Sequence, residues 1–328
     1  MGLKFGLFDD DEIEGAAENL VKNIKEHGWH LTTGFLGLSY LNPMLSDNGY
    51  SDVAYKLLEQ KEYPSWLYSV VHGSTTIWES WSSMRFYNDG TSMMQEDQSL
   101  NHYSYGSVCE WMYRYMLGID RDENSAGFKH FLLKPEIGGS ITSAKGSYNS
   151  ISGNIKSAWE LNVEDGSFTY NATVPANTTA TLYLPVKSDS AEVLEGNVKA
   201  ENSEGIQSKG YKDGCMVYEL ESGNYTFKTT VNTDYNDRAI LDIKNPQQVT
   251  ASMKIGDTEY NSLEQNIIAD SANVPISVTN IESGYEFKYF TDNDGNIYEN
   301  NSKISGQHEL NAVFAYVGSD DGKTGDKK

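Results

Sequence analysis

The spacing of apolar residues changes near Gly118, about a third of the way along the 328-residue chain. Before this point apolar positions recur at helical intervals of i, i+3, i+4 and i+7, as they do at Ala17, Leu20, Val21 and Ile24. After it, short apolar runs alternate with polar positions, which is typical of β-strands. The pattern therefore predicts a multidomain protein with an α-helical part followed by β-structure.

Four helices are predicted within residues 1–118. The first carries the apolar stripe above and ends at Gly28, and the others cover about residues 35–45, 53–58 and 104–116. We interpret residues 72–99 as a long loop. Short connections between helices favour antiparallel neighbours, so we expect helical hairpins.

The β-structure is predicted in two parts. Short strands with turn signals at a spacing of roughly 8 to 12 residues indicate an antiparallel β-sandwich, which we place at residues 119–230. Residues 231–317 are expected to form a separate, small β-rich module. The tail at residues 318–328 is rich in Gly, Asp, Lys and Ser and is expected to be disordered.

Composition narrows the classes of function. The net charge of −22 and the lack of a visible basic patch argue against nucleic-acid binding. No run of about 18 apolar residues is present, so membrane insertion is not expected. The first residues lack a signal-peptide pattern, although the acidity fits an extracellular or cell-surface location. Cys109 and Cys215 fall in different predicted domains, so we expect no disulfide. No spacing typical of metal ligands is present, so we expect no metal site, and we expect no cofactor.

Candidate chemistry is concentrated at residues 73–81, where Glu79 lies between Trp78 and Trp81 in a Gly/Ser/Thr-rich segment. A glycosidase needs a carboxylate that accepts a proton from water or attacks the anomeric carbon, next to aromatic surfaces that hold a sugar. The alternative is a surface glutamate on a loop whose tryptophans pack beneath it. His102 can either bond a sugar hydroxyl or cap the following helix.

A second acidic segment resembles a calcium-binding loop in part of its sequence only. It contains Asp292 and Asp294, followed by Gly295. The glutamate that should stand at the twelfth position of such a loop is missing. We therefore interpret the segment as a hairpin turn and assign no metal to it.

Several short sequence segments resemble the end of the catalytic domain of bacterial α-L-rhamnosidases, glycoside hydrolase family 78, and they follow one another in the same order. They cover residues 31–37, 51–58, 63–66, 73–81, 101–103 and 106–113. The predicted sandwich is similar to the β-domain that follows the catalytic barrel in this family, on residues 133–135, 146–148 and 153–159. The last module resembles, more loosely, small β-repeats of Gram-positive surface proteins.

The family's catalytic domain is an (α/α)6 barrel, and its reaction inverts the anomeric centre. The resemblance therefore implies that Glu79 is the general base and that His102 contacts rhamnose. We take Trp66, Trp78 and Trp81 as the aromatic residues that bind the substrate.

Two positions depart from the family pattern. Leu38-Ser39 stands where Thr-Pro is frequent, and Ser80 stands where an arginine commonly follows the glutamate. Both changes are expected to alter substrate preference.

The family's general acid belongs to an acidic, Trp-containing stretch to which nothing in residues 1–30 is similar. About 118 residues are also too few for a full barrel, since helices average about 11 to 12 residues plus loops. We expect a partial six-hairpin barrel, a truncated and inactive chain, and the missing N-terminal half of the barrel as a candidate partner. The alternatives are a non-catalytic carbohydrate- or cell-surface-binding fragment and a six-hairpin glycosidase for another sugar.

Overall fold

The computed structural model describes residues 1–328 except 88–89, 234–238, 257, 270–272, 294 and 319–328. The chain forms two compact units, Met1–Thr233 and Asp234–Lys328, and each is described by itself. The tail expected to be disordered lies, apart from Gly318, outside the described residues.

The first unit begins with the predicted helices. They are α1 (Ile13–Glu26), α2 (Phe35–Asp47), α3 (Ser51–Glu59), α4 (Trp66–Val71), the 3-10 turn η1 (Ser104–Ser107), α5 (Val108–Trp111) and the π-helical turn η2 (Met112–Met116). The expected helix at 104–116 is helical throughout but changes its hydrogen-bonding pattern twice. The short helix α4 was not predicted, because six residues are too few to show a helical period.

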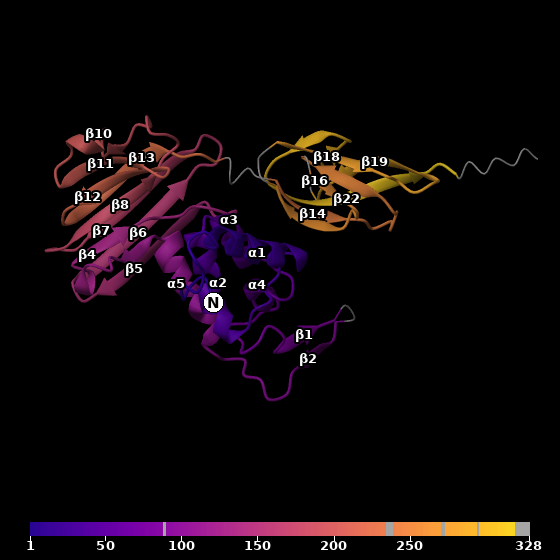
Figure 1. Ribbon diagram of the computed structural model, residues 1–328, viewed down its shortest axis with the longest axis horizontal. Helices are drawn as coiled ribbons and strands as arrows, with labels where there is room; N and C mark the ends of the chain where they lie inside the picture. The colour runs from indigo at the N-terminus through magenta and orange to yellow at the C-terminus, as the bar shows by residue number, and fades with distance from the viewer. Residues whose placement is uncertain (88–89, 234–238, 257, 270–272, 294, 319–328) are drawn as a thin grey trace, which may run out of the picture. The chain divides into compact units, whose positions relative to one another are not determined.

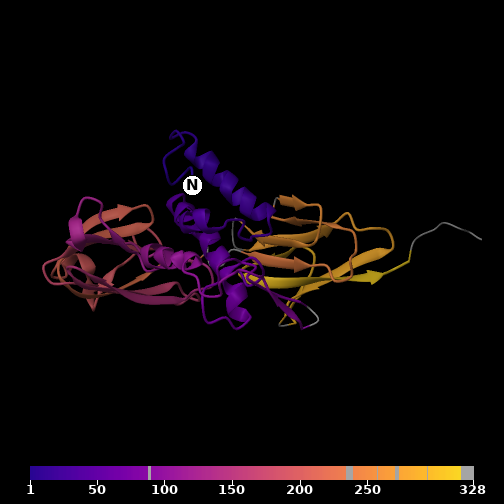
Figure 2. The same cartoon turned by 90° about the horizontal axis from the view of Figure 1, so that it is seen from below.

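The predicted apolar stripes face the interior. In α1 the buried residues are Ala17, Val21 and Ile24, which share one face because they are four and three positions apart. In α3 the buried residues include Val53 and Leu57 in the same relation. Both views show these helices gathered on one side of the strand layers that follow them in the same unit (Figures 1 and 2).

The expectation of one long loop at residues 72–99 is wrong in part. Strands β1 (Met84–Phe86) and β2 (Ser92–Met94) pair in antiparallel fashion and project from the helices as a hairpin (Figure 1). The sequence holds a signal for it in Asn88-Asp89-Gly90, since Asp-Gly between short apolar runs is a typical hairpin connection.

The rest of the first unit is a two-sheet sandwich. One sheet has the order β10-β9-β13-β7-β6-β5 and the other β11-β12-β8-β4-β3. The strands are β3 (Ile119–Arg121), β4 (His130–Leu133), β5 (Ser143–Ser150), β6 (Gly153–Leu161), β7 (Ser167–Val174), β8 (Thr179–Pro185), β9 (Leu194–Glu195), β10 (Val198–Lys199), β11 (Ile206–Lys212), β12 (Cys215–Leu220) and β13 (Gly223–Thr230), with 3-10 turns η3 (Ala126–Phe128) and η4 (Ala200–Asn202).

Alternation along these strands builds one core between the sheets. Strand β7 buries Phe168, Tyr170, Ala172 and Val174, every second residue. The pairing is antiparallel except between β4 and β8, which run parallel. This one pair departs from the antiparallel sandwich that was expected, because β5 to β7 lie between these strands in sequence and belong to the other sheet.

The second unit also has two sheets around one core. Their orders are β17-β14-β22-β19-β20 and β16-β15-β18-β21. The strands are β14 (Ile240–Lys244), β15 (Ser252–Ile255), β16 (Thr258–Tyr260), β17 (Gln265–Ile268), β18 (Val274–Thr279), β19 (Tyr285–Thr291), β20 (Ile297–Tyr298), β21 (Ser302–Ile304) and β22 (Gln307–Tyr316).

The acidic segment between β19 and β20 turns the chain, with the amide of Gly295 donating to the carbonyl of Asp292 at 3.1 Å; Asp294 lies outside the described residues. Within the described part of both units, no helix is long and apolar enough to cross a membrane.

The helical part is joined to the sandwich through carbonyl groups at the end of η2. The indole of Trp159 donates to the carbonyl of Met116 at 2.7 Å, and the hydroxyl of Ser157 donates to that of Leu117 at 2.6 Å. Both donors come from buried positions of β6. Gly118 then turns the chain at a φ of +73°. It lies directly against the backbone of Lys134 and Pro135, which follow β4.

Gly118→Ala is expected to lower the free energy of unfolding of the first unit by about 3 kcal/mol. An added Cβ would lie 2.2 Å from the carbonyl carbon of Lys134, in a backbone conformation that is already unfavourable for alanine. Urea unfolding measures the loss. In the control, Gly49→Ala, φ is +84° but no atom lies within 4 Å, so only about 1 kcal/mol is expected. Equal losses in the two variants would contradict the close approach at Gly118.

Candidate active site

The backbone brings the two candidate polar residues onto neighbouring segments. The amide of Glu79 donates to the carbonyl of Ser99 at 2.9 Å, and the amide of His102 donates to the carbonyl of Ile77 at 2.7 Å. These two bonds hold residues 77–79 alongside residues 99–102. The loop that contains β1 and β2 therefore begins and ends at the candidate site.

A second contact with the same segment orients the Glu79 carboxylate. The amide of Ser99 donates to Oε2 of Glu79 at 2.6 Å, so the two residues exchange a pair of hydrogen bonds. The glutamate is only partly buried. Among the described residues nothing donates to its other oxygen, Oε1. The carboxylate is thus fixed through one oxygen and keeps the other for a ligand or a water molecule.

The ring of His102 is held between two aromatic rings. Phe35, the first residue of α2, stacks on it at a centroid distance of 5.1 Å, and Tyr103 stacks at 5.1 Å. The amide of Ser104 donates to its Nδ1 at 3.3 Å. Because a backbone amide only donates, Nδ1 is the acceptor and the neutral ring carries its proton on Nε2. Nε2–H is then able to donate to a sugar hydroxyl.

The tryptophans lie differently from the sugar-binding surface that was expected. Trp66 and Trp78 are 7% and 6% exposed, so neither offers an open face to a sugar. The indole of Trp66 donates to the carbonyl of Tyr105, and that of Trp81 donates to Thr33. Trp81 is partly buried, with one face stacked on Tyr105 at 3.9 Å.

A cavity of about 20 Å³ lies among these rings. It has room for about one water molecule and not for a sugar. No acidic side chain lines it, and neither Glu79 nor His102 belongs to its wall. Burial raises the pKa of Tyr105, so this phenol stays protonated and acts as part of the packing. Within the described residues, no three His, Cys, Asp or Glu side chains are grouped to hold a metal ion.

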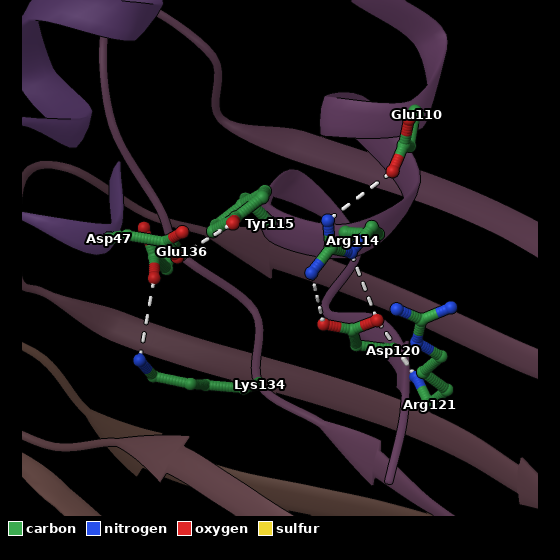
Figure 3. A network of polar contacts seen from close by, with 8 residues as sticks. All are labelled: Asp47, Glu110, Arg114, Tyr115, Asp120, Arg121, Lys134 and Glu136. Carbon is green, nitrogen blue, oxygen red and sulfur yellow. Dashed lines mark hydrogen bonds and ion pairs between the residues drawn. The ribbon is translucent and has the colours of Figure 1, made fainter. Parts of the chain in front are cut away.

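A second polar cluster occupies the junction between η2 and the sandwich (Figure 3). The guanidinium of Arg114 makes two hydrogen bonds of 3.0 Å to the carboxylate of Asp120 and one of 3.3 Å to Glu110. The pairing with Asp120 is the largest cause that raises the pKa of Arg114. The sequence offers no signal for this pairing, because it depends on how the chain turns at Gly118.

The other half of the cluster is more deeply buried. The phenol of Tyr115 donates to Asp47 at 2.7 Å, and burial raises the pKa of this phenol. Glu136 accepts a hydrogen bond from Ser51 and lies 3.5 Å from the ammonium of Lys134. Burial nevertheless raises the pKa of Glu136, against the lowering effect of Ser51 and Lys134. These contacts tie the helices to the sandwich.

Comparison with known families covers both parts of the first unit. Residues 1–116 match the family described as the bacterial alpha-L-rhamnosidase 6 hairpin glycosidase domain, and residues 118–199 match the bacterial alpha-L-rhamnosidase C-terminal domain. The chain belongs to the bacterial α-L-rhamnosidase family. The first match contains Glu79 and His102, together with the segments that pair beside them.

Individual rhamnosidases show the same relation. An alpha-L-rhamnosidase of Streptomyces avermitilis is 40% identical over 227 residues, which make up 69% of this chain and 20% of that protein. One from Formosa agariphila is 38% identical over 195 residues, 60% of this chain and 20% of that protein. The chain thus spans about a fifth of the length of these curated relatives.

Solved structures agree with the sequence matches. The crystal structure of the Streptomyces avermitilis enzyme complexed with L-rhamnose superposes with a TM-score of 0.61 at 38% identity, covering 69% of this chain and 21% of that one. The alpha-L-rhamnosidase from Dictyoglumus thermophilum gives a TM-score of 0.59 at 28% identity, covering 70% and 24%. The rhamnosidase family therefore shares the helical part and the sandwich described above.

Glu136→Gln is expected to change how stability depends on pH. A carboxyl whose pKa is raised in the folded state binds protons more tightly there than in the unfolded chain. The contribution of Glu136 to stability is therefore greatest below the ordinary glutamate pKa and falls as pH rises from that value through the raised one. Urea unfolding at a series of pH values should show this fall for the unmodified chain and a smaller one for Glu136→Gln. The exposed Glu160→Gln is the control, and identical pH profiles for all three proteins would contradict the assignment.

Proposed function

We propose that this chain supplies the general base, Glu79, and a sugar-contacting histidine, His102, to an inverting α-L-rhamnosidase. The observation that carries the proposal is the orientation of the Glu79 carboxylate by the amide of Ser99, on a segment paired with that of His102. The match of residues 1–116 to a six-hairpin glycosidase domain supports it. The substrate would be a glycoside or polysaccharide that ends in α-L-rhamnose, since a solved relative is complexed with L-rhamnose.

The chemistry of an inverting hydrolase assigns distinct roles to two carboxyl groups. One carboxylate takes a proton from water as the water attacks the anomeric carbon, and a carboxylic acid about 6.5 to 9.5 Å away protonates the leaving oxygen. In this proposal Oε1 of Glu79 takes the proton from water, and Nε2–H of His102 holds a hydroxyl of the sugar. No acidic residue lines the neighbouring cavity. We propose that residues outside this chain supply the acid.

Exposed apolar residues on the helices support a larger catalytic domain. Leu36 on α2 is 78% exposed, and Val70 and Val71 at the end of α4 are 57% and 55% exposed. Large apolar side chains that are exposed on a helix are candidates for contact with another element that packs over them. We propose that further helices of the six-hairpin domain cover these residues and close a partial (α/α)6 barrel over the site.

A fusion tests the assignment of Glu79. Joining residues 1–328 in frame behind the first hairpins of the Streptomyces avermitilis relative should give hydrolysis of an aryl α-L-rhamnoside with inversion. The unfused chain should give none. In the fusion, Glu79→Gln is expected to lower kcat about 10³-fold, because the attacking water loses its base. His102→Ala should mainly raise KM.

The matched control is Glu96→Gln, which alters an exposed glutamate in the same loop and should leave kcat unchanged. Anomeric NMR of the first product reports the stereochemistry. Hydrolysis by the unfused chain that depends on Glu79, or product with a retained anomeric configuration, would refute the proposed division of roles.

The exposed helix faces can be tested on the chain itself. Residues 1–328 should enhance the fluorescence of an apolar dye, and Leu36→Glu with Val71→Glu should weaken that enhancement while the circular dichroism stays the same. The fusion should bind less dye than the unfused chain. An unfused chain that is monomeric and binds no dye would argue against a covering layer of helices.

A further inference from the structure

A second and much larger cavity lies at the junction of the helical part and the sandwich. Its volume is about 610 Å³, and its walls come from η2, from β3 and from β5. Sites for small molecules typically measure about 300 to 1,000 Å³. The wall shares no residue with the small cavity among the tryptophans. This cleft is therefore a separate site of a size suited to a disaccharide.

Aromatic rings form the apolar part of the cleft. Tyr113 and Tyr148 line it and are 39% and 41% exposed. Phe128 supports Tyr148 at a centroid distance of 4.9 Å. Flat rings with a polar tip hold the apolar face of a sugar ring while the phenol bonds its hydroxyls. By contrast, Trp66 and Trp78 are buried and offer no such surface.

The charged side chains of the cleft carry a small positive excess. Lys4, Arg114 and Arg121 are cationic, whereas Glu110 and Asp120 are anionic, in a chain whose net charge is −22. Arg114 is already bound to both carboxylates. Arg121 is exposed, lies beside Asp120 in Figure 3, and makes no ion pair with any residue that the structure describes. The cleft thus presents a free guanidinium next to a fixed Arg–Asp pair.

We propose that this cleft binds a uronic acid residue of an acidic oligosaccharide. The forked guanidinium of Arg121 takes the carboxylate of the ligand in a two-point contact. The ring lies against Tyr148 and Tyr113, and the Arg114–Asp120 pair offers a donor and an acceptor for neighbouring hydroxyls. The choice of an anion follows from the charges, and the choice of a sugar over other acids rests on the proposed function. Such a site would hold a charged polysaccharide while its rhamnose ends are cleaved elsewhere.

Calorimetric titration of residues 1–328 with digalacturonate tests the site. The neutral probe is digalactose of the same linkage, which lacks only the carboxylates. Digalacturonate should bind at least about tenfold more tightly, and binding should weaken as salt is added. Arg121→Ala should raise its Kd about tenfold and Tyr148→Ala by a similar factor, whereas Arg121→Lys should recover part of the affinity.

Two further variants separate this site from the rest of the protein. Arg85→Ala removes an exposed arginine of β1, outside the cleft, and should leave the Kd unchanged. Glu79→Gln should also leave the Kd unchanged. The proposal for the cleft can therefore be refuted while the catalytic proposal stands, and the catalytic proposal can be refuted while the one for the cleft stands. Equal affinity for the two disaccharides, no measurable binding, or an unchanged Kd in Arg121→Ala with native circular dichroism would overturn the proposal.

Discussion

The first unit depends on how the last carbonyl groups of its helical part are satisfied. A helix ends with carbonyls that have no partner within the helix. Here the sandwich supplies the donors, since Trp159 and Ser157 of β6 reach the carbonyls of Met116 and Leu117. A buried carbonyl without a partner would be costly, so these two bonds fix the direction in which the chain leaves η2. Gly118 makes the turn possible at that point.

Two neighbouring features follow from this junction. Because the chain turns at Gly118, the carboxylate of Asp120 on β3 returns beneath Arg114 on η2 and forms one edge of the large cleft. The next residue of η2, Tyr115, reaches Asp47 at the end of α2. The helices are thereby fixed to the sandwich, and the end of α2 is held in place. The large cleft at the junction and the candidate active site on the helices thus depend on the same packing of η2 against the sandwich.

In the candidate active site, backbone amides hold the two candidate polar side chains. Glu79 is oriented by the backbone of a neighbouring segment through Ser99, and His102 by the amide of Ser104, two residues further along its own segment. Trp66 and Trp78 are buried, and the indoles of Trp66 and Trp81 donate to the carbonyls of Tyr105 and Thr33, so these rings take part in the packing around the site. The Glu79 carboxylate is thus fixed through one of its two oxygens. Under the proposed inverting mechanism, a second carboxyl group is needed on the other side of the bond.

The sequence by itself determined that helices come first and strands follow, because burial repeats every three or four residues in α1 and every second residue in β7. It also offered Glu79 and His102 as candidate site residues, through a carboxylate between two indoles, a histidine before a helix and a resemblance to a known family. Only the tertiary structure decided how far each tryptophan is buried, that Phe35 stacks on His102, and that β4 pairs in parallel with β8. It also brought Arg114 to Asp120 at the turn of Gly118. These outcomes depend on contacts between segments distant in sequence, and no local pattern of residues specifies which segments meet.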